Sequence, residues 1–443
     1  MGVMPVNRLL IGMSLPMMVS MLVQALYNVV DSVFVAKVNE AALTAVSLAF
    51  PVQNLMIAIA VGTGVGVNAL LSKSLGEKNF ERVNSTADNA VFLAVVSYAV
   101  MLLIGIFGIG PFYRSQTDDV QIVGYGIAYA RICCCCSFGV FLQVTMERLL
   151  QSTGRTFYTM IIQGTGAVIN IILDPILIFG LYGFPRMEAA GAAAATVAGQ
   201  IIASILAVIL NQKVNREVRL QRKGFRPDRR IIAQIYRVGV PSIIMQSIAS
   251  VMTYGMNLIL MAFTSTATAV FGIYFKLQSF IFMPVFGLNN GMIPIIAYNY
   301  GADRKERVMR TIRYSVLYAM GIMAVGTLIF HVFPGELLIM FEASETMMQI
   351  GVPALRIISV SFIIAGYCIV CGSVFQALGN GMYSLMVSVA RQLFVLLPVA
   401  FLLSRLGNVN YVWWAFPIAE IASLVMSTVF LVRIYKKVIA ALH

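Results

Sequence analysis

The chain of 443 residues is 60% hydrophobic and only 11% charged, with a formal net charge of +13. Soluble domains carry about a quarter charged residues, so this composition excludes an ordinary soluble domain. Apolar runs of 18 or more residues recur along the whole chain, as is typical of membrane-spanning helices, and the alternating strands of a membrane barrel are absent. We therefore expect an all-α polytopic membrane protein.

Hydropathy predicts twelve spans in chain order. They lie at 9–36, 43–72, 87–110, 122–150, 157–182, 189–212, 231–262, 266–299, 312–334, 347–377, 381–404 and 410–432. The longest polar segment follows the sixth span and divides the protein into halves. We expect an N-terminal lobe at residues 1–212, a basic linker at 213–230 and a C-terminal lobe at 231–443.

The two halves repeat. A shift of 225 residues places "GEKNFERV" (76–83) over "GADRKERV" (301–308), and "QSTGRTFY" (151–158) over "QALGNGMY" (376–383), without a gap. One register that holds over about 150 residues indicates a duplication. Six spans per half is an even number, so both halves enter the membrane in the same direction. Such parallel repeats favour a binding site between the halves.

The distribution of Lys and Arg predicts the orientation. With the N-terminus inside, the inner segments hold 22 Lys and Arg residues, eight of them between Lys213 and Arg230, whereas the outer loops hold four. Cytoplasmic loops carry this excess, so we expect both termini and the linker to be cytoplasmic. The positive charge is thereby explained without nucleic acid as a partner. The linker is expected to set the topology and to lie near anionic membrane lipid.

Polar side chains inside the spans form three stripes. The first span carries Gln24, Tyr27, Asn28 and Asp31 on one helix face. The fifth span carries Gln163, Asn170 and Asp174, and the sixth carries Thr196 and Gln200. Polar faces turn away from lipid, where they would be costly. We therefore expect Asp31 and Asp174 to share a small oxygen-rich pocket in the N-terminal half.

The chemistry of such a pocket allows two uses. Two carboxylates in a poorly hydrated site cannot both stay ionised without a counter-charge, so one binds a proton or a sodium ion joins them. Pro175 has no N–H, which frees the carbonyl of Ile171 as a candidate ligand for a hard cation. The alternative is that Asp174 only forms hydrogen bonds to neighbouring helices.

The C-terminal half does not copy this pocket. The positions 225 residues after Asp31, Asn170, Asp174 and Thr196 are Met256, Val395, Val399 and Ile421. This asymmetry favours one coupling-ion site, in the N-terminal half. The second half instead offers candidate cleft residues, or a structural ion-pair network, in Lys276, Gln278, Arg391 and Glu420. For Glu147, beside Arg148 near a helix end, we expect an interfacial role.

Several motifs resemble one family. They are "YNVVDSVFVAKVNEAALTAVSLAFP", "SKSLGEKN", "INIILDPILIFG", "GAAAATVAGQ" and "NYGADRKERV". Together they resemble the multidrug and toxic compound extrusion (MATE) family, with DinF-like and MepA-like bacterial members most similar. The resemblance covers essentially the whole chain. It implies a V-shaped pair of six-helix lobes in the bacterial cytoplasmic membrane, which exports amphipathic, often cationic compounds by proton or sodium antiport.

The resemblance also implies the site residues. The family's N-lobe cation site corresponds to Asp31, Asn170, Asp174 and Thr196, which would bind sodium if sodium is the coupling ion. NorM-like members carry further acidic residues in the C-lobe. This chain has Ala249 near the first of those positions and no carboxylate in its tenth span, so a C-lobe sodium site of that kind is not expected.

The leading hypothesis is a drug or metabolite exporter, expected as a monomer without a resident cofactor, in which H⁺ or Na⁺ binds Asp31 and Asp174. The first helix would hinge near Pro16, with Pro175 as a second hinge. One alternative is a flippase for lipid-linked saccharides, which would need a large basic cleft. An intramembrane enzyme is disfavoured, because the two histidines, His331 and His443, lie near span or chain ends and no HExxH or GxSxG motif occurs.

Overall fold

A computed structural model describes residues 1–221 and 223–443, so Arg222 of the predicted basic linker lies outside the described residues. The described chain is helical and contains no strand, which confirms the all-α fold class. It packs into two compact units. We call Val19–Gly239 the N-unit, and Met1–Met18 together with Val240–His443 the C-unit.

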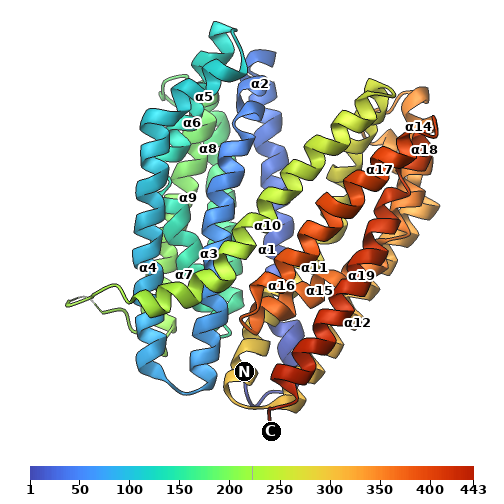
Figure 1. Ribbon diagram of the computed structural model, residues 1–443. Helices are drawn as coiled ribbons and strands as arrows, with labels where there is room; N and C mark the ends of the chain where they lie inside the picture. Colours follow the sequence, from blue (N-terminus) through green and yellow to red (C-terminus); the bar gives the residue numbers. More distant parts are fainter. Residues whose placement is uncertain (222) are drawn as a thin grey trace. The chain divides into compact units, whose positions relative to one another are not determined.

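Figure 1 shows the helices of both units. The N-unit contains most of α1 (Val6–Ala36), then α2 (Glu40–Leu48), α3 (Phe50–Gly76), α4 (Phe80–Leu103), α5 (Ile109–Gln116), α6 (Val120–Cys135), α7 (Phe138–Ser152), α8 (Thr156–Phe179), α9 (Ala189–Val214) and the start of α10 (Arg229–Met261). A π-helical turn, Ile104–Gly108, joins α4 to α5.

The C-unit contains the start of α1 and the rest of α10. It continues with α11 (Ser265–Gly301), α12 (Lys305–Val332), α13 (Pro334–Ile339), α14 (Glu345–Ser359), α15 (Phe362–Ala377), α16 (Gly381–Val389), α17 (Leu397–Ser404), α18 (Val409–Val412) and α19 (Ala415–Ile434). π-Helical turns at Ala390–Leu396 and Tyr435–Ile439 join α16 to α17 and follow α19.

The helices agree with the predicted spans. Among the described residues, ten continuous helical stretches are long and apolar enough to cross a membrane, and the count reaches twelve if two bent pairs each form one span. The bent pairs are α6 with α7, at 43°, and α14 with α15, at 50°. They correspond to the predicted spans 122–150 and 347–377, which are repeat equivalents. The duplication seen in the sequence is therefore also a duplication of the bend.

The start of α1 is held in the C-unit by close contact with α11. A Cβ atom added to Gly291 would lie 2.4 Å from Ser14 Oγ, and one added to Gly287 would lie 2.6 Å from Met18 Cα. The Ser14 hydroxyl donates a hydrogen bond to the carbonyl of Leu288 at 3.3 Å. Small residues spaced four apart allow two helix backbones to approach this closely.

The start of α10 is held in the N-unit in the same way. A Cβ atom added to Gly66 of α3 would lie 2.1 Å from the carbonyl oxygen of Ile235. A Cβ atom added to Gly239 of α10 would lie 3.2 Å from the carbonyl oxygen of Gly62 on α3. Since Gly62 and Gly66 are the repeat equivalents of Gly287 and Gly291, one helix–helix joint is built twice. The beginnings of α1 and α10 are thus exchanged between the two halves of the sequence.

This exchange makes the packing differ from the predicted lobe boundaries at both ends. Residues 1–18 pack with the C-terminal half, and residues 231–239 pack with the N-terminal half. α1 passes from one unit to the other after Met18, two residues beyond Pro16, and α10 passes after Gly239, just before Pro241. Both crossings therefore lie beside a proline.

The linker is held by α4 through its own backbone. The N–H groups of Arg219, Gln221 and Asp228 donate to Asn84 at 2.8 Å, Asp88 at 2.9 Å and Asn89 at 3.0 Å. An ion pair of 2.7 Å also joins Arg155 to Glu217. The predicted lipid contact is not tested by these bonds, but they show that the linker belongs to the N-unit.

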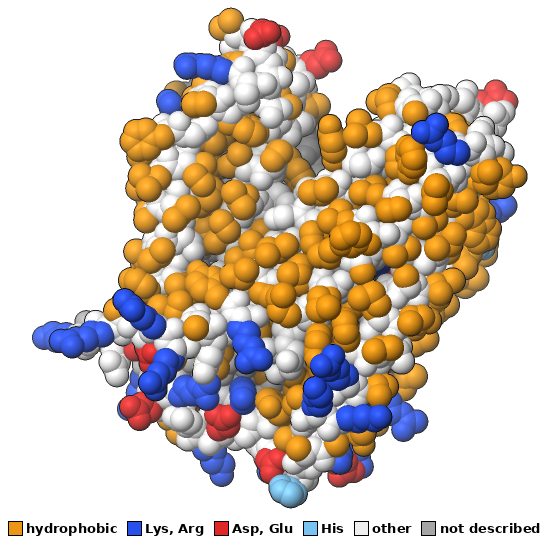
Figure 2. Space-filling view, viewed as in Figure 1, with side chains coloured by type: hydrophobic (Ala, Val, Ile, Leu, Met, Phe, Trp, Pro, Cys, Tyr) orange, Lys and Arg blue, Asp and Glu red, His pale blue; other side chains and the backbone are white. Residues whose placement is uncertain are grey.

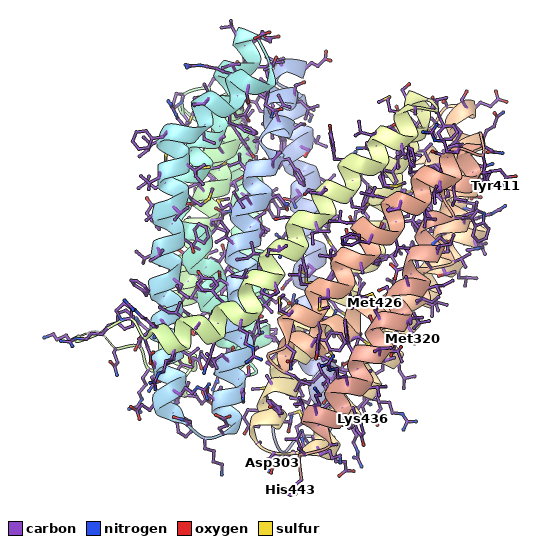
Figure 3. The ribbon with its side chains drawn as sticks, in the orientation of Figure 1. Asp303, Met320, Tyr411, Met426, Lys436 and His443 are labelled. Carbon is purple, nitrogen blue, oxygen red and sulfur yellow. The ribbon has the colours of Figure 1, made fainter. Side chains whose placement is uncertain are left out.

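Charged residues gather at one end of each unit. Figure 2 shows hydrophobic side chains over the middle of the helices, with Lys and Arg side chains near the linker in the N-unit and near the termini in the C-unit. In Figure 3, Asp303, Lys436 and His443 lie at this end of the C-unit, and Tyr411 lies at the other. The His443 N–H donates to Asp303 at 3.3 Å. The separation of charge from apolar surface is that of a multi-pass membrane protein.

Candidate functional site

The close packing of α8 against α9 places two of the predicted site residues side by side. A Cβ atom added to Gly199 of α9 would lie 2.7 Å from the carbonyl oxygen of Gly166 on α8 and 3.5 Å from Asn170 Cβ. The helices can approach this closely because both positions are glycine. One turn along, Asn170 of α8 therefore meets Thr196 of α9.

The Asn170 amide bridges Thr196 and Asp174. One amide atom lies 3.0 Å from Thr196 Oγ1. In the orientation that satisfies both ends, Asn170 Nδ2 donates to Asp174 Oδ2 at 3.2 Å and its oxygen accepts from the Thr196 hydroxyl at 3.0 Å. We adopt this orientation because the opposite one would set the amide oxygen against a carboxylate oxygen, and both are acceptors.

Asp31 of α1 completes the group. Its carboxyl group lies within hydrogen-bond reach of the Asp174 carboxyl group. Asp174 is fully buried and Asn170 is 2% exposed. The Oδ1 atoms of Asp31 and Asp174 are both buried without a hydrogen-bond partner among the described residues. The structure thus brings together Asp31, Asn170, Asp174 and Thr196, as the sequence predicted.

This geometry needs a positive charge. Two carboxylate groups in contact are both acceptors and repel each other, so a proton shared between them or a bound cation is required. The unpartnered Oδ1 atoms supply two oxygen ligands, and Asn170 and Thr196, which are hydrogen-bonded to each other, carry two further oxygens. Sodium would fit that donor set. With the Asn170 N–H directed at Asp174, a shared proton satisfies the pair without a change in the amide, whereas a cation would require the amide to turn its oxygen towards the ion.

Two tyrosines flank the pair of acids. Tyr27, which shares the α1 stripe with Asp31, is a near neighbour of both carboxyl groups. Tyr129 of α6 is 3% exposed, lies close to Asp31, and its hydroxyl accepts a 2.7 Å hydrogen bond from Gln53 Nε2. Gln53 and Tyr129 were missed by the sequence analysis. They lie on different helices, so no spacing within one helix could reveal them.

The other predicted supporting residues are not bound to the four central ones. Side-chain hydrogen bonds from Gln24, Asn28 or Gln200 to that group are absent among the described residues. Gln163 instead donates to Glu147 Oε2 at 2.9 Å. Pro175 lies inside a continuous α8, directly after Asp174. The polar stripes thus continue beyond the site rather than all entering it.

The four candidate cleft residues all lie in the C-unit, and the structure pairs two of them. Arg391, in the π-helical turn Ala390–Leu396, donates to Glu420 Oε1 of α19 at 2.7 Å. Lys276 is exposed and lies over the Phe341 ring at 5.9 Å, outside that pair. Gln278 is partly buried on α11. An ion pair is thus confirmed, whereas a lining role for these residues stays a prediction.

Comparison with models of known protein families shows to which family this chain belongs. A family model described as MatE matches residues 16–176 and again residues 241–402. The chain belongs to the MATE family. The two matches begin 225 residues apart, which is the repeat distance found in the sequence. Each match begins at one of the prolines, Pro16 and Pro241, that lie beside the crossings between the units.

Curated relatives of this MATE transporter are similar along nearly their whole length. Multidrug export protein MepA of Staphylococcus saprophyticus is 25% identical over 408 residues, covering 92% of this chain and 89% of its own. MepA of Staphylococcus haemolyticus is 26% identical over 416 residues, with the same coverage. MepA of Staphylococcus aureus strain MRSA252 is 24% identical over 422 residues, covering 94% and 91%. Each of these relatives is named as a multidrug export protein.

Solved structures share the fold. An outward-facing multidrug resistance MATE family transporter of the MOP superfamily has a TM-score of 0.92 at 24% identity, covering 97% of this chain and 96% of its own. A MOP superfamily transporter from Pyrococcus furiosus, whose binding pocket is described as having reverse polarity, has a TM-score of 0.88 at 25% identity, with the same coverage. The fold of the MATE family is therefore shown for this chain.

Proposed function

We propose that this MATE transporter is a proton-coupled exporter of amphipathic, cationic small molecules that acts as a monomer in the bacterial cytoplasmic membrane. The observation that carries the proposal is the direct contact between Asp31 and Asp174, which requires a positive charge in a buried site. The names of the MepA relatives support multidrug export as the transport activity.

The path of α1 supports a coupling role for this site. Asp31 contacts α8 in the N-unit, while the same helix begins in the C-unit, beside Pro16. Loss of the shared proton would leave two repelling carboxylates and would push α1 away from α8. α1 is one of the two helices through which the chain passes from one unit to the other. A change in the packing of α1 at Asp31 can therefore be transmitted along this helix to the C-unit. Proton binding and drug binding would then disfavour each other, as antiport requires.

The saccharide-flippase alternative receives less support. That function would need a basic cleft, and Arg391 and Lys276 were the residues that favoured it. The 2.7 Å ion pair with Glu420 neutralises Arg391, which leaves only Lys276 of those two as an uncompensated charge. We therefore retain the exporter as the proposed function.

Imposed ion gradients test the proposal directly. Ethidium transport is measured in everted membrane vesicles, with proton and sodium gradients imposed separately. We expect the proton gradient to drive transport and a sodium gradient at constant pH to have no effect. Transport driven by sodium alone would show that Na⁺, and not a proton, is the coupling ion at the same residues. No driven transport by either ion, from vesicles that contain the folded protein, would contradict the proposed antiport.

The Thr196 hydroxyl offers a finer test of the site. Thr196→Val removes one of the two donors to the Asn170 oxygen, because the Thr196 backbone N–H also donates to it at 3.0 Å. Loss of the hydroxyl hydrogen bond costs about 0.5–1.5 kcal/mol. If that loss weakens proton binding, half-maximal transport should need a proton concentration higher by roughly 2- to 13-fold, as measured from the pH dependence of efflux. Thr196→Ser keeps the hydroxyl and should stay close to the wild type. If efflux has the same pH dependence in Thr196→Val and Thr196→Ser, the Thr196 hydroxyl does not contribute to proton binding.

A further inference from the structure

A third carboxyl group of the N-unit is buried away from the paired acids. Glu147 of α7 is 3% exposed, although its position near a helix end suggested an interfacial role. Its Oε1 accepts from Gln143 Nε2 and its Oε2 accepts from Gln163 Nε2, both at 2.9 Å. A carboxyl group inside a membrane protein is costly and is therefore typical of a functional site.

Glu147 has no ion-pair partner within 4 Å among the described residues. Arg148 is the one described titratable group that acts on it. Arg148 itself is directed elsewhere, since its Nη1 donates to Gln151 at 2.8 Å and its side chain lies over Gly64 of α3. Consecutive helix residues point in different directions, so these neighbours in sequence do not pair. From the helices packed against α7, namely α3, α4, α8 and α9, the group that reaches Glu147 is the uncharged Gln163.

The amides around Glu147 can serve both the ionised and the protonated carboxyl group. When Glu147 is ionised, two amide N–H groups donate to it, as the structure shows. Gln163 Oε1 is buried without a partner among the described residues. If Gln163 rotates its amide by half a turn, that oxygen can accept the O–H of a protonated Glu147. Amide N–H donors oppose a metal cation, so the ligand that fits this shell is a proton.

Glu147 lies between the paired acids and one end of α8. Its partner Gln163 is on the same face of α8 as Asn170 and Asp174, which follow it by about 10 and 16 Å along the helix axis. The start of α8 at Thr156 lies about 10 Å in the other direction, at the end predicted to be cytoplasmic. Thr159, one turn before Gln163, is fully buried and its hydroxyl has no partner among the described residues. The polar face therefore continues from Asp174 past Glu147 towards that end.

We propose that Glu147 is a second proton-binding carboxyl group, which receives the proton released from Asp31 and Asp174 and passes it towards the cytoplasm. The step moves one proton from the paired acids to the Glu147 carboxylate, and then from Glu147 to water. This inference rests on the proposed proton antiport. It assigns Glu147 to the proton path and not to the binding of the exported molecule.

Two transport measurements on reconstituted protein test the role of Glu147. The first is ethidium transport driven by a pH gradient. The second is exchange of internal for external ethidium at equal pH on both sides, which needs no net proton movement. For Glu147→Gln we expect at least a tenfold loss of driven transport with exchange retained, and the pH dependence that Asp31 and Asp174 give to exchange should remain. Glu147→Asp should restore part of the driven transport, because it restores an ionisable group.

The controls separate this inference from the proposed function. Glu81→Gln changes an exposed acid on α4 of the same unit and should leave both measurements unchanged. Wild-type driven transport in Glu147→Gln, or an equal loss of drive and exchange, would overturn the role of Glu147 while proton antiport stands. Sodium-driven transport by the wild type would overturn it as well. A wild type without any driven transport would instead contradict the proposed function.

Discussion

Asp174→Asn is expected to abolish ethidium efflux driven by a proton gradient, with a loss on the order of 100-fold, the upper range of a coupling free energy. The substitution keeps the size of the side chain, and its oxygen can still accept from Asn170 at the 3.2 Å contact. What it removes is the second ionisable group of a buried pair. The protein should therefore remain folded in the membrane while its transport no longer depends on the pH gradient.

The partner acid gives a sharper form of this experiment. Asp31 and Asp174 would share one positive charge. Asp31→Asn should therefore lower proton-driven efflux about as much as Asp174→Asn does, and the double variant should show little further loss of efflux. Glu306→Gln, which changes an exposed acid of the C-unit, is the matched control and should transport normally. Near-normal driven efflux in either single variant would remove that acid from the coupling site.

Gly66→Ala should be among the most destabilising single-methyl changes in the N-unit. The added Cβ would lie 2.1 Å from the Ile235 carbonyl oxygen, which belongs to a helix backbone and cannot rotate away. Overpacking of this kind costs about 1–3 kcal/mol, which corresponds to a lowering of the melting temperature by roughly 3–10 °C. Thermal unfolding of purified protein followed by fluorescence measures the change. Since the start of α10 must shift, transport should fall as well.

The repeat supplies both a replicate and a control. Gly291→Ala meets Ser14 in the C-unit at 2.4–2.8 Å and should show a similar loss. Gly164→Ala, in the interior of α8 with nothing within 4 Å of the added atom, should stabilise slightly because alanine favours a helix more than glycine does. If the Gly66→Ala protein has the same melting temperature as the Gly164→Ala protein, the contact between α3 and α10 tolerates a wider spacing.

The sequence was sufficient to predict most of the candidate coupling site. Asp31, Asn170 and Asp174 are polar residues at helical spacing in apolar helices, and that pattern needs no knowledge of the tertiary structure. Thr196 was the weaker prediction, because a hydroxyl costs little inside a helix. The hydrogen bond between Gln53 and Tyr129 could not be predicted, since it joins two helices whose relative rotation is fixed only by packing.

Glu147 and the lobe boundaries show a different limit of the sequence. Glu147 precedes an arginine near a helix end, which suggested a simple surface role, but the packing of α7 buries both side chains. The glycines at 62, 66, 287 and 291 indicate that some helix approaches closely, but not which one. Only the structure shows that the partners are the first residues of α10 and α1, and that both cross from one unit to the other.

That crossing has a consequence for biosynthesis. The first eighteen residues leave the ribosome long before their binding surface on α11 exists, since Ser14 precedes its partner Leu288 by 274 positions. The C-unit therefore cannot be completed until α11 has been translated and inserted, and the N-unit must wait for the start of α10. A nascent chain that stops at the linker lacks the start of α10 and carries an undocked α1. Neither half of the duplicated sequence is a finished folding unit by itself.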